Sequence, residues 1–523
     1  MNIESPSINR SPARQLLAQV LDPGSFTSWD KPVLDEAGIG DEYAEKLNRA
    51  RQRTGLDEAV ITGRGTIHDQ DAAVIVSEFD FLAGSIGVAT AHRIYDAVRA
   101  ATASGLPLIA FPVSGGTRMQ EGTAAFAQMI RITAAVEAHK AAGLPYLVYL
   151  RNPTTGGVMA SWGSLGHVTA AEPGALLGFL GPKVYEALNE RPFPEGIQVS
   201  ENLQQRGIID AVVRPENLRA HFRPLLRVMC AGPGIPDDVP LLDAGPPAAS
   251  SDAWESVLRT RRPERPEALD ILHTTATDVT FLHGTGRGES EDGIFIALAL
   301  FGHHPSVVLG HRRPRGPGYA FGPASLRTAQ RGMELAAQLN LPLLSIIDTA
   351  GADISPAAEE GSLAGEIARS LARLIRLETP TLSVILGQGA GGGALALLPA
   401  DRIIAAQHGW LAPLPPEGAS VILYKSSANA AHIARAQGIS AMELEAAGIV
   451  DRIVPEENAD SESDLCSRMG TVIQDELLSL RTLNRAGRSH NMITKRAERF
   501  DKFGRLPQET AAACVLQTAL ACN

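Results

Sequence analysis

Two runs of glycine occur where chemistry without charged side chains is possible. Gly156–Gly157 follow an apolar stretch, and no charged residue lies from Asn152 to Gly166. Gly391–Gly393 follow a second apolar stretch. Between a strand and a helix, adjacent glycines leave main-chain N–H groups without internal acceptors and without side chains in front of them. Two such donors aimed at one oxygen form an oxyanion hole, and the same geometry can bind a phosphate.

The sequence around these glycines does not support a nucleotide-binding loop. The pattern G-x-x-x-x-G-K-[ST] is absent, and "GQGAGG" at residues 387–392 matches G-x-G-x-x-G only in its letters. A tight strand–helix connection without a ligand is the simple alternative for either run alone. Two runs at matched places in a repeat favour a functional role, with two oxyanion holes for two carbonyl-bearing substrates.

The matched places come from an internal repeat. "LPLIAFPVSGG" begins at Leu106 and a similar stretch, "LPLLSIIDTAG", begins at Leu341. We call the separation of these two leucines along the chain the repeat offset. Pro145 and Pro380, which begin the next apolar stretches, are separated by the same offset. A constant offset indicates one structural unit written twice.

Each copy is typical of alternating strands and helices. In the first copy the pattern predicts strands at Leu108–Val113 and Tyr146–Leu150, joined by a helix over Gly122–Ala141. The helical period places four apolar residues of that helix inward: Phe126, Met129, Ile130 and Val136. In the second copy it predicts strands at 343–347 and 382–386 and a helix over 361–377. Such alternation predicts a layered α/β architecture.

Length and composition place limits on the class of protein. A chain of 523 residues is too long for one core, so we expect a first domain at 1–229, a Pro- and Gly-rich linker at 230–262 and a second domain at 263–523. The net charge of −11 argues against a nucleic-acid binder. No apolar stretch is long enough to span a membrane, and the first residues lack the apolar core of a secretory signal, so we expect a cytoplasmic protein.

Short motifs along the chain strongly resemble a known family. "AGSIG" (83–87), "SGGTRMQEG" (114–122), "LPYLVYLRNPTTGGV" (144–158) and "AEPGALLGFLGPKV" (171–184) resemble the β subunit of bacterial acetyl-CoA carboxylase carboxyltransferase. Its α subunit is similar to "FLHGTGRGE" (281–289), "VVLGHRRP" (307–314), "IDTAGA" (347–352), "GGGALAL" (391–397) and "PPEGASVILYKS" (415–426). The order is β then α in one polypeptide.

The resemblance implies an α/β fold with two tandem crotonase-like (ClpP/crotonase) ββα-spiral domains. It implies transfer of a carboxyl group from carboxybiotin, held on a biotin carboxyl carrier protein, to acetyl-CoA, giving malonyl-CoA. Biotin carboxylase and the carrier would be separate partners, and active sites would form between domains of two protomers in a homodimer or larger homo-oligomer. A decarboxylase of malonyl-type substrates and an inactive CoA-binding scaffold are the alternatives.

Carried over by motif, the resemblance assigns catalytic glycines on both sides. Gly156 and Gly157 would hold the thioester enolate oxygen, and Gly392 and Gly393 the ureido oxygen of biotin, with an ambiguity of one residue. Six further residues are candidates for substrate contact: Gly115, Gly116, Arg118, Gly351, Ala394 and Gly418. The glycines among them are about equally well explained as turns.

For Arg118 two interpretations remain open, a contact with a CoA phosphate and a structural salt bridge, for example to Glu121. A cluster of arginines is interpreted as a solvated loop, and two adjacent histidines as loop surface: Arg312, Arg313 and Arg315, and His303–His304.

This chain departs from the family pattern in two respects. The four-cysteine zinc ribbon of the β subunit is missing, because no C-x-x-C pair occurs, so no zinc is expected. On the biotin side, Ala350, Gly361 and Gln388 stand where the family has Pro, Arg and Glu. Binding of the acyl-CoA is therefore the better supported of the two expectations, and the acyl chain cannot be assigned from the sequence.

Overall fold

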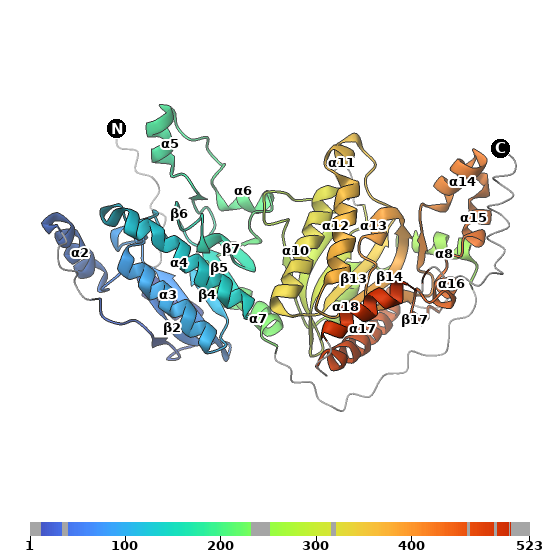
Figure 1. Cartoon of the computed structure of the whole chain (residues 1–523), viewed down its shortest axis with the longest axis horizontal. Coiled ribbons are helices and arrows are strands. Elements are labelled where there is room, and N and C mark those ends of the chain that lie inside the picture. Colours follow the sequence, from blue (N-terminus) through green and yellow to red (C-terminus); the bar gives the residue numbers. More distant parts are fainter. Residues whose placement is uncertain are drawn as a thin grey trace. The chain divides into compact units, whose positions relative to one another are not determined.

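The computed structural model describes residues 12–33, 40–231, 251–314, 321–457, 461–485, 489–501 and 503. The chain forms two compact units. Unit 1 contains residues 1–230 with 286–288, and unit 2 contains residues 231–285 with 289–523. Figure 1 labels the helices and strands of both units.

Unit 1 is built on a mainly parallel sheet. Its strand order is β1 (Thr27–Ser28), β2 (Val60–Ile67), β3 (Gln70–Ser77), β4 (Leu108–Phe111), β5 (Tyr146–Leu150), β7 (Val168–Ala171) and β9 (Ala211–Val212). The first strands pair antiparallel, and pairing from β3 to β9 is parallel. A short parallel pair, β6 (Thr154–Thr155) and β8 (Leu177–Gly178), lies beyond the end of β5.

Helices cover both faces of this sheet. On one face α3 (Val88–Ala103) and α4 (Gly122–Ala141) lie side by side (Figure 1) and share a core with the strands. On the other, α1 (Ala13–Val20) and α7 (Leu218–Met229) pack together, and Phe222 of α7 meets Phe111 of β4 edge to face. The remaining helices are α2 (Asp41–Thr54), α5 (Pro182–Asn189) and α6 (Ser200–Gln205). The near-continuous apolar strands follow from this burial on both faces.

Unit 2 has the same plan. Its strand order is β10 (Asp278–Leu282), β11 (Ile294–Phe301), β12 (His304–His311), β13 (Leu343–Thr349), β14 (Thr381–Ala390), β15 (Arg402–Ala406) and β17 (Arg452–Val454), with β16 (Trp410–Ala412) beside the end of β14. The hairpin β11–β12 is antiparallel, and the strands from β12 onward pair in parallel.

The helices of unit 2 also form two layers. The pair α10 (Pro323–Leu339) and α12 (Leu363–Arg376) corresponds to α3 and α4, while α9 (Ala268–Thr275) and α17 (Glu462–Arg485) share a core with the strands. The other helices are α8 (Ala253–Thr260), α11 (Pro356–Glu360), α13 (Gly391–Leu395), α14 (Pro416–Tyr424), α15 (Ala430–Ala436), α16 (Ala441–Ala446) and α18 (Ser489–Phe500).

Strand register confirms the duplication predicted from the sequence. In unit 1 Leu108 of β4 pairs with Tyr146 of β5, and in unit 2 Leu343 pairs with Thr381. Both residues of the second pair follow those of the first by the repeat offset. The predicted α/β class with two tandem spiral domains is therefore confirmed, and with it the strands and helices expected around the glycines.

One part of the predicted core is wrong. Met129 and Val136 of α4 are buried as expected, but Phe126 and Ile130 are 63% and 75% exposed. The buried face of α4 also includes Ala125, Ile132 and Ala135. The helical period identified the helix correctly, but it was compatible with two apolar faces and did not show which one is buried.

Two other expectations change in the structure. Within the segment expected to be a linker, Ala253–Thr260 forms α8 and packs in unit 2 against Trp410 and Ala412, while 232–250 lies outside the described residues. His304 was expected on a loop surface but is the buried first residue of β12, whereas His303 is exposed. Among the described residues no helix is both long and apolar enough to cross a bilayer.

We expect mild acid to destabilise unit 2. Burial lowers the pKa of His304 and of His311 from 6.5 to about 4. Between about pH 6.5 and about pH 4 these two histidines are protonated in the unfolded chain but neutral in the folded chain. The free energy of unfolding therefore falls as the pH decreases across this window. Urea unfolding at pH 7 and at about pH 5 measures the fall, and His304→Phe should reduce it. The matched variant at the exposed neighbour, His303→Asn, should leave the difference in free energy of unfolding between the two pH values nearly unchanged. An equal difference in the wild type and in both variants would contradict the expectation.

Candidate functional site

A serine or threonine closes the turn that follows β4 in unit 1 and the turn at the end of β13 in unit 2. In unit 1 the Ser114 Oγ accepts the N–H of Gly116 at 3.0 Å and donates to its carbonyl at 3.2 Å. In unit 2 the Thr349 Oγ1 makes the same two bonds with Gly351, both at 3.1 Å. We call Ser114–Gly116 and Thr349–Gly351 the hydroxyl turns. Their glycines have φ of +116° and +129°, a region that side chains rarely tolerate.

A second turn, at the glycine runs, follows the next strand. Gly156 has φ +65°, and Gly391, which follows it by the repeat offset, has φ +68°. Gly157 therefore corresponds to Gly392, and the matched pair in unit 2 is Gly391–Gly392, one residue earlier than the expected Gly392–Gly393. We call Gly156–Gly157 and Gly391–Gly393 the glycine turns.

In unit 1 the two turns are in direct contact. A Cβ on Gly156 would lie 3.1 Å from the Cα of Gly116, and one on Gly116 would lie 3.8 Å from the Cα of Gly156. Side chains at these positions would separate the turns. The glycines therefore allow a close backbone approach, in addition to a positive φ.

The glycine turns carry free main-chain donors. The Gly156 N–H is held by the carbonyls of Gly178 and Phe179, at 3.2 and 3.0 Å, but within the described residues no acceptor takes the Gly157 N–H. The N–H groups of Gly392 and Gly393 lie in the first turn of α13, where a helix has no internal acceptors. Each turn can therefore offer N–H groups to a negatively charged oxygen without a charged side chain.

The remaining expected residues lie near these turns with different surroundings. Gly115 precedes Gly116, and its N–H is taken by the Ala83 carbonyl at 2.9 Å. Ala394 is fully buried in α13. Gly418 lies in the first turn of α14, where an added Cβ would lie 4.0 Å from the Cβ of Leu414.

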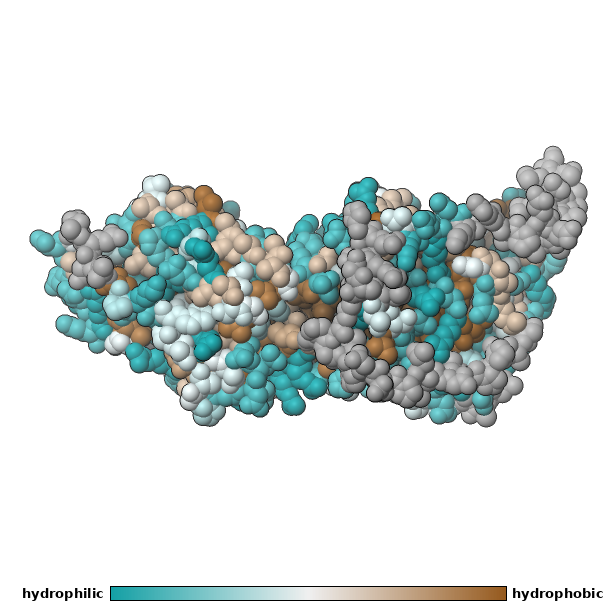
Figure 2. All heavy atoms as spheres, turned by 60° about the horizontal axis from the view of Figure 1, so that its bottom comes forward, coloured by the Kyte–Doolittle hydropathy of each residue, from teal (hydrophilic) through white to brown (hydrophobic). Residues whose placement is uncertain are grey.

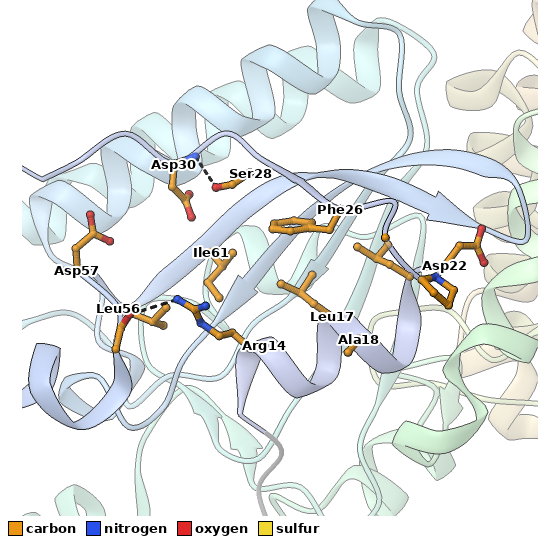
Figure 3. A pocket seen from close by; sticks show the side chains of 14 residues that line it. Arg14, Leu17, Ala18, Asp22, Phe26, Ser28, Asp30, Leu56, Asp57 and Ile61 are labelled. Atoms are coloured by element: carbon orange, nitrogen blue, oxygen red, sulfur yellow. Dashed lines mark hydrogen bonds between the residues drawn. The ribbon is translucent and has the colours of Figure 1, made fainter.

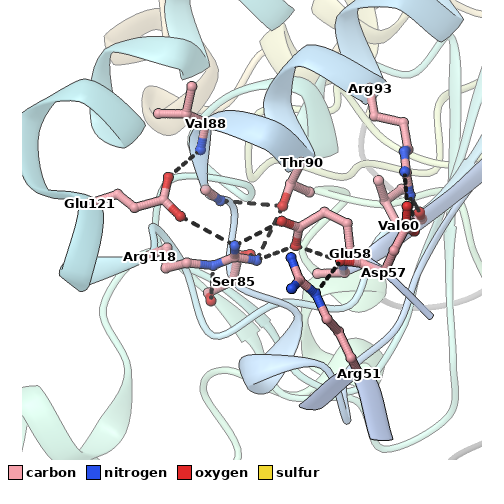
Figure 4. Close-up of polar contacts among 12 residues, drawn as sticks. Arg51, Asp57, Glu58, Val60, Ser85, Val88, Thr90, Arg93, Arg118 and Glu121 are labelled. Carbon is pink, nitrogen blue, oxygen red and sulfur yellow. Dashed lines mark hydrogen bonds and ion pairs between the residues drawn. The ribbon is translucent and has the colours of Figure 1, made fainter. Parts of the chain in front are cut away.

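Arg118 is part of a buried ion network (Figure 4) and not a free cation. It is 1% exposed and makes two bonds to Glu58, at 2.5 and 3.0 Å, and a longer one to Glu121 at 3.3 Å. Ser85 and Thr90 accept from the same guanidinium. Of the two interpretations left open by the sequence, the geometry favours the structural salt bridge, and the expected contact with a CoA phosphate is corrected accordingly.

Through its backbone Arg118 also supports the hydroxyl turn. Its N–H donates to the Ile86 carbonyl, and the Ile86 N–H donates to the Gly116 carbonyl, both at 3.0 Å. Glu121 accepts the N–H of Val88 at the start of α3 (Figure 4). The network therefore provides an acceptor at the N-terminus of α3 and holds the hydroxyl turn Ser114–Gly116 through Ile86.

An arginine in unit 2 is also structural. The Arg313 Nε donates to Asp348 at 2.7 Å, and its other nitrogens donate to the carbonyls of Arg265 and Thr260. Burial raises the pKa of Asp348, and Arg313 opposes that rise. Arg313 is thus not in a solvated loop as expected, Arg312 lies over the Phe295 ring, and Arg315 lies outside the described residues.

Two of the residues that depart from the family pattern, Gly361 and Gln388, fit their surroundings. A Cβ on Gly361 would lie 2.7 Å from Pro323 Cγ, so a longer side chain is crowded there. The Gln388 side chain accepts from Arg261, which also pairs with Glu417 at 2.6 Å. Both are accommodated without disturbing the glycine turn.

Sequence reasoning missed Ser114 and Thr349. The signal was available, because a hydroxyl residue stands at both positions and the two are separated by the repeat offset. Serine and threonine are frequent, and only the bonds to Gly116 and Gly351 distinguish these two.

A cavity of about 710 Å³ in unit 1 lies at the edge strand, away from the turns (Figure 3). Its apolar lining comes from α1, the segment 23–30 and β2, including Leu17, Phe26 and Ile61. The carboxylates of Asp22 and Asp57 at its rim are paired with arginines. No residue of the hydroxyl or glycine turns lines it.

Comparisons with known proteins agree on one family. The model of the carboxyl transferase domain matches residues 9–485. A relative from Mycobacterium tuberculosis (strain ATCC 25618 / H37Rv), called a probable biotin-dependent acyl-coenzyme A carboxylase beta3 subunit, is 51% identical over 505 residues, which cover 96% of this chain and all of the relative. A relative from Salinispora tropica, called acetyl-coenzyme A carboxylase carboxyl transferase subunits beta/alpha, is 36% identical over 94% of this chain and 90% of its own.

Solved structures share the fold. The crystal structure of transcarboxylase 12S matches with a TM-score of 0.68 at 18% identity, over 88% of this chain and 89% of that one. A single-chain, multi-domain long-chain acyl-CoA carboxylase matches with a TM-score of 0.69 at 19% identity, over 88% of this chain and 45% of that one. The crotonase-like two-domain architecture is therefore shared with carboxyltransferase structures.

We expect Arg118→Met to destabilise unit 1 strongly, because it leaves the buried Glu58 carboxylate without its partner. The cost should be about 3–5 kcal/mol in urea unfolding, and Glu58→Leu in the same chain should recover much of it. The control is Arg49→Met, at an exposed pair with Glu45, with a cost of about 0.5 kcal/mol or less. A variant Arg118→Met of normal stability that binds CoA esters weakly would instead restore the phosphate interpretation.

Proposed function

The chain belongs to the carboxyl transferase domain family, and from that premise we propose that it is the carboxyltransferase component of a biotin-dependent acyl-CoA carboxylase. The observation that carries this proposal is the matched pair of glycine turns, each with an N–H group free for an anionic oxygen. Relatives named as acyl-CoA and acetyl-CoA carboxylase subunits, which are similar over nearly the whole chain, support it.

The chemistry asks for donors and not for a side-chain base. When bound, biotin supplies the carboxyl group and, once its C–N bond breaks, a ureido nitrogen that takes the α-proton of the acyl-CoA, while the α-carbon bonds to the carboxyl carbon. The chain must hold the two reactants together and stabilise negative charge on the thioester oxygen and on the ureido oxygen. Neutral N–H donors at Gly157 and Gly392 fit both oxygens.

The resemblance of the first half to a β subunit and of the second half to an α subunit assigns the two sides. Unit 1 binds the acyl-CoA, with Gly156 and Gly157 at the thioester oxygen and the hydroxyl turn Ser114–Gly116 behind them. In unit 2 Gly391–Gly393 face the ureido oxygen, with Thr349–Gly351 behind. Both turns are placed by equivalent strand ends, which supports a shared task on two different substrates.

Exposed apolar side chains around the turns support a homodimer. Met119 and Ile354, at matched positions, are 83% and 93% exposed, and Phe179 and Leu414, also matched, are 69% and 41% exposed. Hydrophobic residues appear among hydrophilic ones on the surface of both units (Figure 2). A second copy of the chain that covers these residues would exclude water from the site, and we propose such a dimer or a larger homo-oligomer.

Acetyl-CoA is the proposed substrate and malonyl-CoA the product, with a biotin carboxyl carrier protein and a biotin carboxylase as partners. The relatives that are 36% identical carry acetyl-CoA carboxylase names, and the relatives at 51% identity carry only the acyl-CoA name. A series of acyl-CoA esters of increasing chain length, assayed with the carboxylated carrier, tests this choice. Preference for a chain longer than acetyl would overturn it and leave the carboxyltransferase role intact.

The pure protein should release CO₂ from malonyl-CoA only when biocytin is present. The reaction runs the transfer in reverse: the carboxyl group moves from malonyl-CoA to a ureido nitrogen of biocytin, the proton of that nitrogen goes to the α-carbon, and acetyl-CoA is left. The carboxybiocytin then loses CO₂, which a coupled assay measures. Release without biocytin would make the protein a decarboxylase, and binding of CoA without turnover would make it a scaffold of the same fold. Either result contradicts the proposal.

Gly157→Pro should lower kcat of this reaction by about 10²–10³ because it removes a donor from the oxyanion hole. Gly157→Ala keeps the N–H and adds a methyl group 3.2 Å from Thr117 Oγ1, so it should cost much less. Gly40→Ala, with no atom near its added Cβ, is the control for activity and folding. Equal activity of the Pro and Ala variants would remove Gly157 from the mechanism.

A further inference from the structure

A buried histidine lies next to the glycine turn of unit 2 and takes no part in the proposed chemistry. His311 is the last residue of β12 and is 1% exposed. Its Nδ1 accepts the N–H of Asp348 at 3.4 Å. Asp348 directly precedes the hydroxyl turn Thr349–Gly351, so the imidazole contacts the strand end that carries the site.

The protonation state of His311 follows from these contacts. Burial lowers the pKa of its imidazole to about 4, so the ring is neutral near pH 7. Because Nδ1 accepts a backbone N–H, the single ring proton is on Nε2. Within the described residues this Nε2 has no hydrogen-bond partner.

Among the described residues, no main-chain N–H is bound to the carbonyl of Gly393. In α13 the Ala396 N–H bonds to the Gly392 carbonyl and the Leu397 N–H to the Ala394 carbonyl, so neither takes the Gly393 carbonyl. Burial is the main influence on the pKa of His311, and the backbone carbonyls of Ile346 and then of Gly393 act in the opposite direction, as carbonyl oxygens next to an imidazole N–H do. Donor and acceptor are neighbours but are not in bonding geometry.

Aromatic packing surrounds the His311 ring and the backbone of Gly393. The Phe321 ring meets the imidazole edge to face at 4.8 Å, and a Cβ on Gly393 would lie 2.4 Å from that ring. His311 therefore packs on Phe321, and Phe321 packs against Gly393 of the glycine turn.

We propose that His311 is a positioning residue for the biotin-side glycine turn, donating from Nε2 to the Gly393 carbonyl when an anionic oxygen is bound at the Gly392 N–H. This inference rests on the proposed function. The bond fixes the rotation of the peptides that carry the donors. His311 touches neither substrate and acts only through the orientation of α13.

Two amide variants separate the two ring nitrogens. In His311→Gln the amide reaches the position of Nε2, and in His311→Asn it reaches only the position of Nδ1. With biocytin and malonyl-CoA, His311→Asn should lower kcat by about tenfold or more, because a misplaced reacting group costs up to about a hundredfold. His311→Gln should recover most of the loss, and the KM for malonyl-CoA, bound by unit 1, should change less than about twofold in both.

The control is His304→Phe, at the other end of the same strand. His304 is also buried, with an unpartnered Nδ1 among the described residues, but it is far along β12 from the turn. It should keep the wild-type kcat. Equal activities of the Asn and Gln variants, or an equal loss in His304→Phe, would overturn the role of His311 while wild-type activity with biocytin upholds the function. A wild-type protein without that activity would overturn both.

Discussion

The candidate site of unit 1 depends on the close approach of two backbone turns at the ends of neighbouring parallel strands. In unit 1 the Cα of Gly116 and the position of a Cβ on Gly156 are 3.1 Å apart, a distance that leaves no room for a side chain. The turns are held by a hydroxyl group, Ser114 or Thr349, and by the sheet register behind it. Donor N–H groups at such a place are preorganised, which is the property that stabilises a developing oxyanion.

Charged side chains near the turns serve the scaffold. Arg118 is paired with Glu58 and Glu121, and Arg313 with Asp348 and two carbonyls. A buried ion pair is costly to break because each partner is left uncompensated. These pairs therefore keep the turns in place, and the guanidinium groups of Arg118 and Arg313 are bound by partners within the scaffold.

The two halves share the same backbone arrangement but differ in the side chains that pack behind the turns. Strand register, glycine φ values and hydroxyl turns recur at the repeat offset, whereas the residues behind the turns do not. Ile86 corresponds to Phe321, and within the described residues the Arg118 network has no counterpart in unit 2, where His311 and Asp348 occupy the region behind the turn. Shared geometry with different support is consistent with one kind of donor site adapted to two substrates.

Much of this could be predicted from the sequence, because local rules govern it. Apolar runs bounded by proline and glycine identified the strands, and the offset between Leu106 and Leu341 identified the duplication. The glycines themselves revealed the candidate site, since few residue types permit a positive φ. What the sequence could not supply were the partners of long side chains and the choice between two apolar faces of α4, because both depend on contacts between residues far apart in the chain. Only the tertiary structure decided that Arg118 meets Glu58, that Phe126 is exposed, and that His311 and Phe321 pack near Gly393.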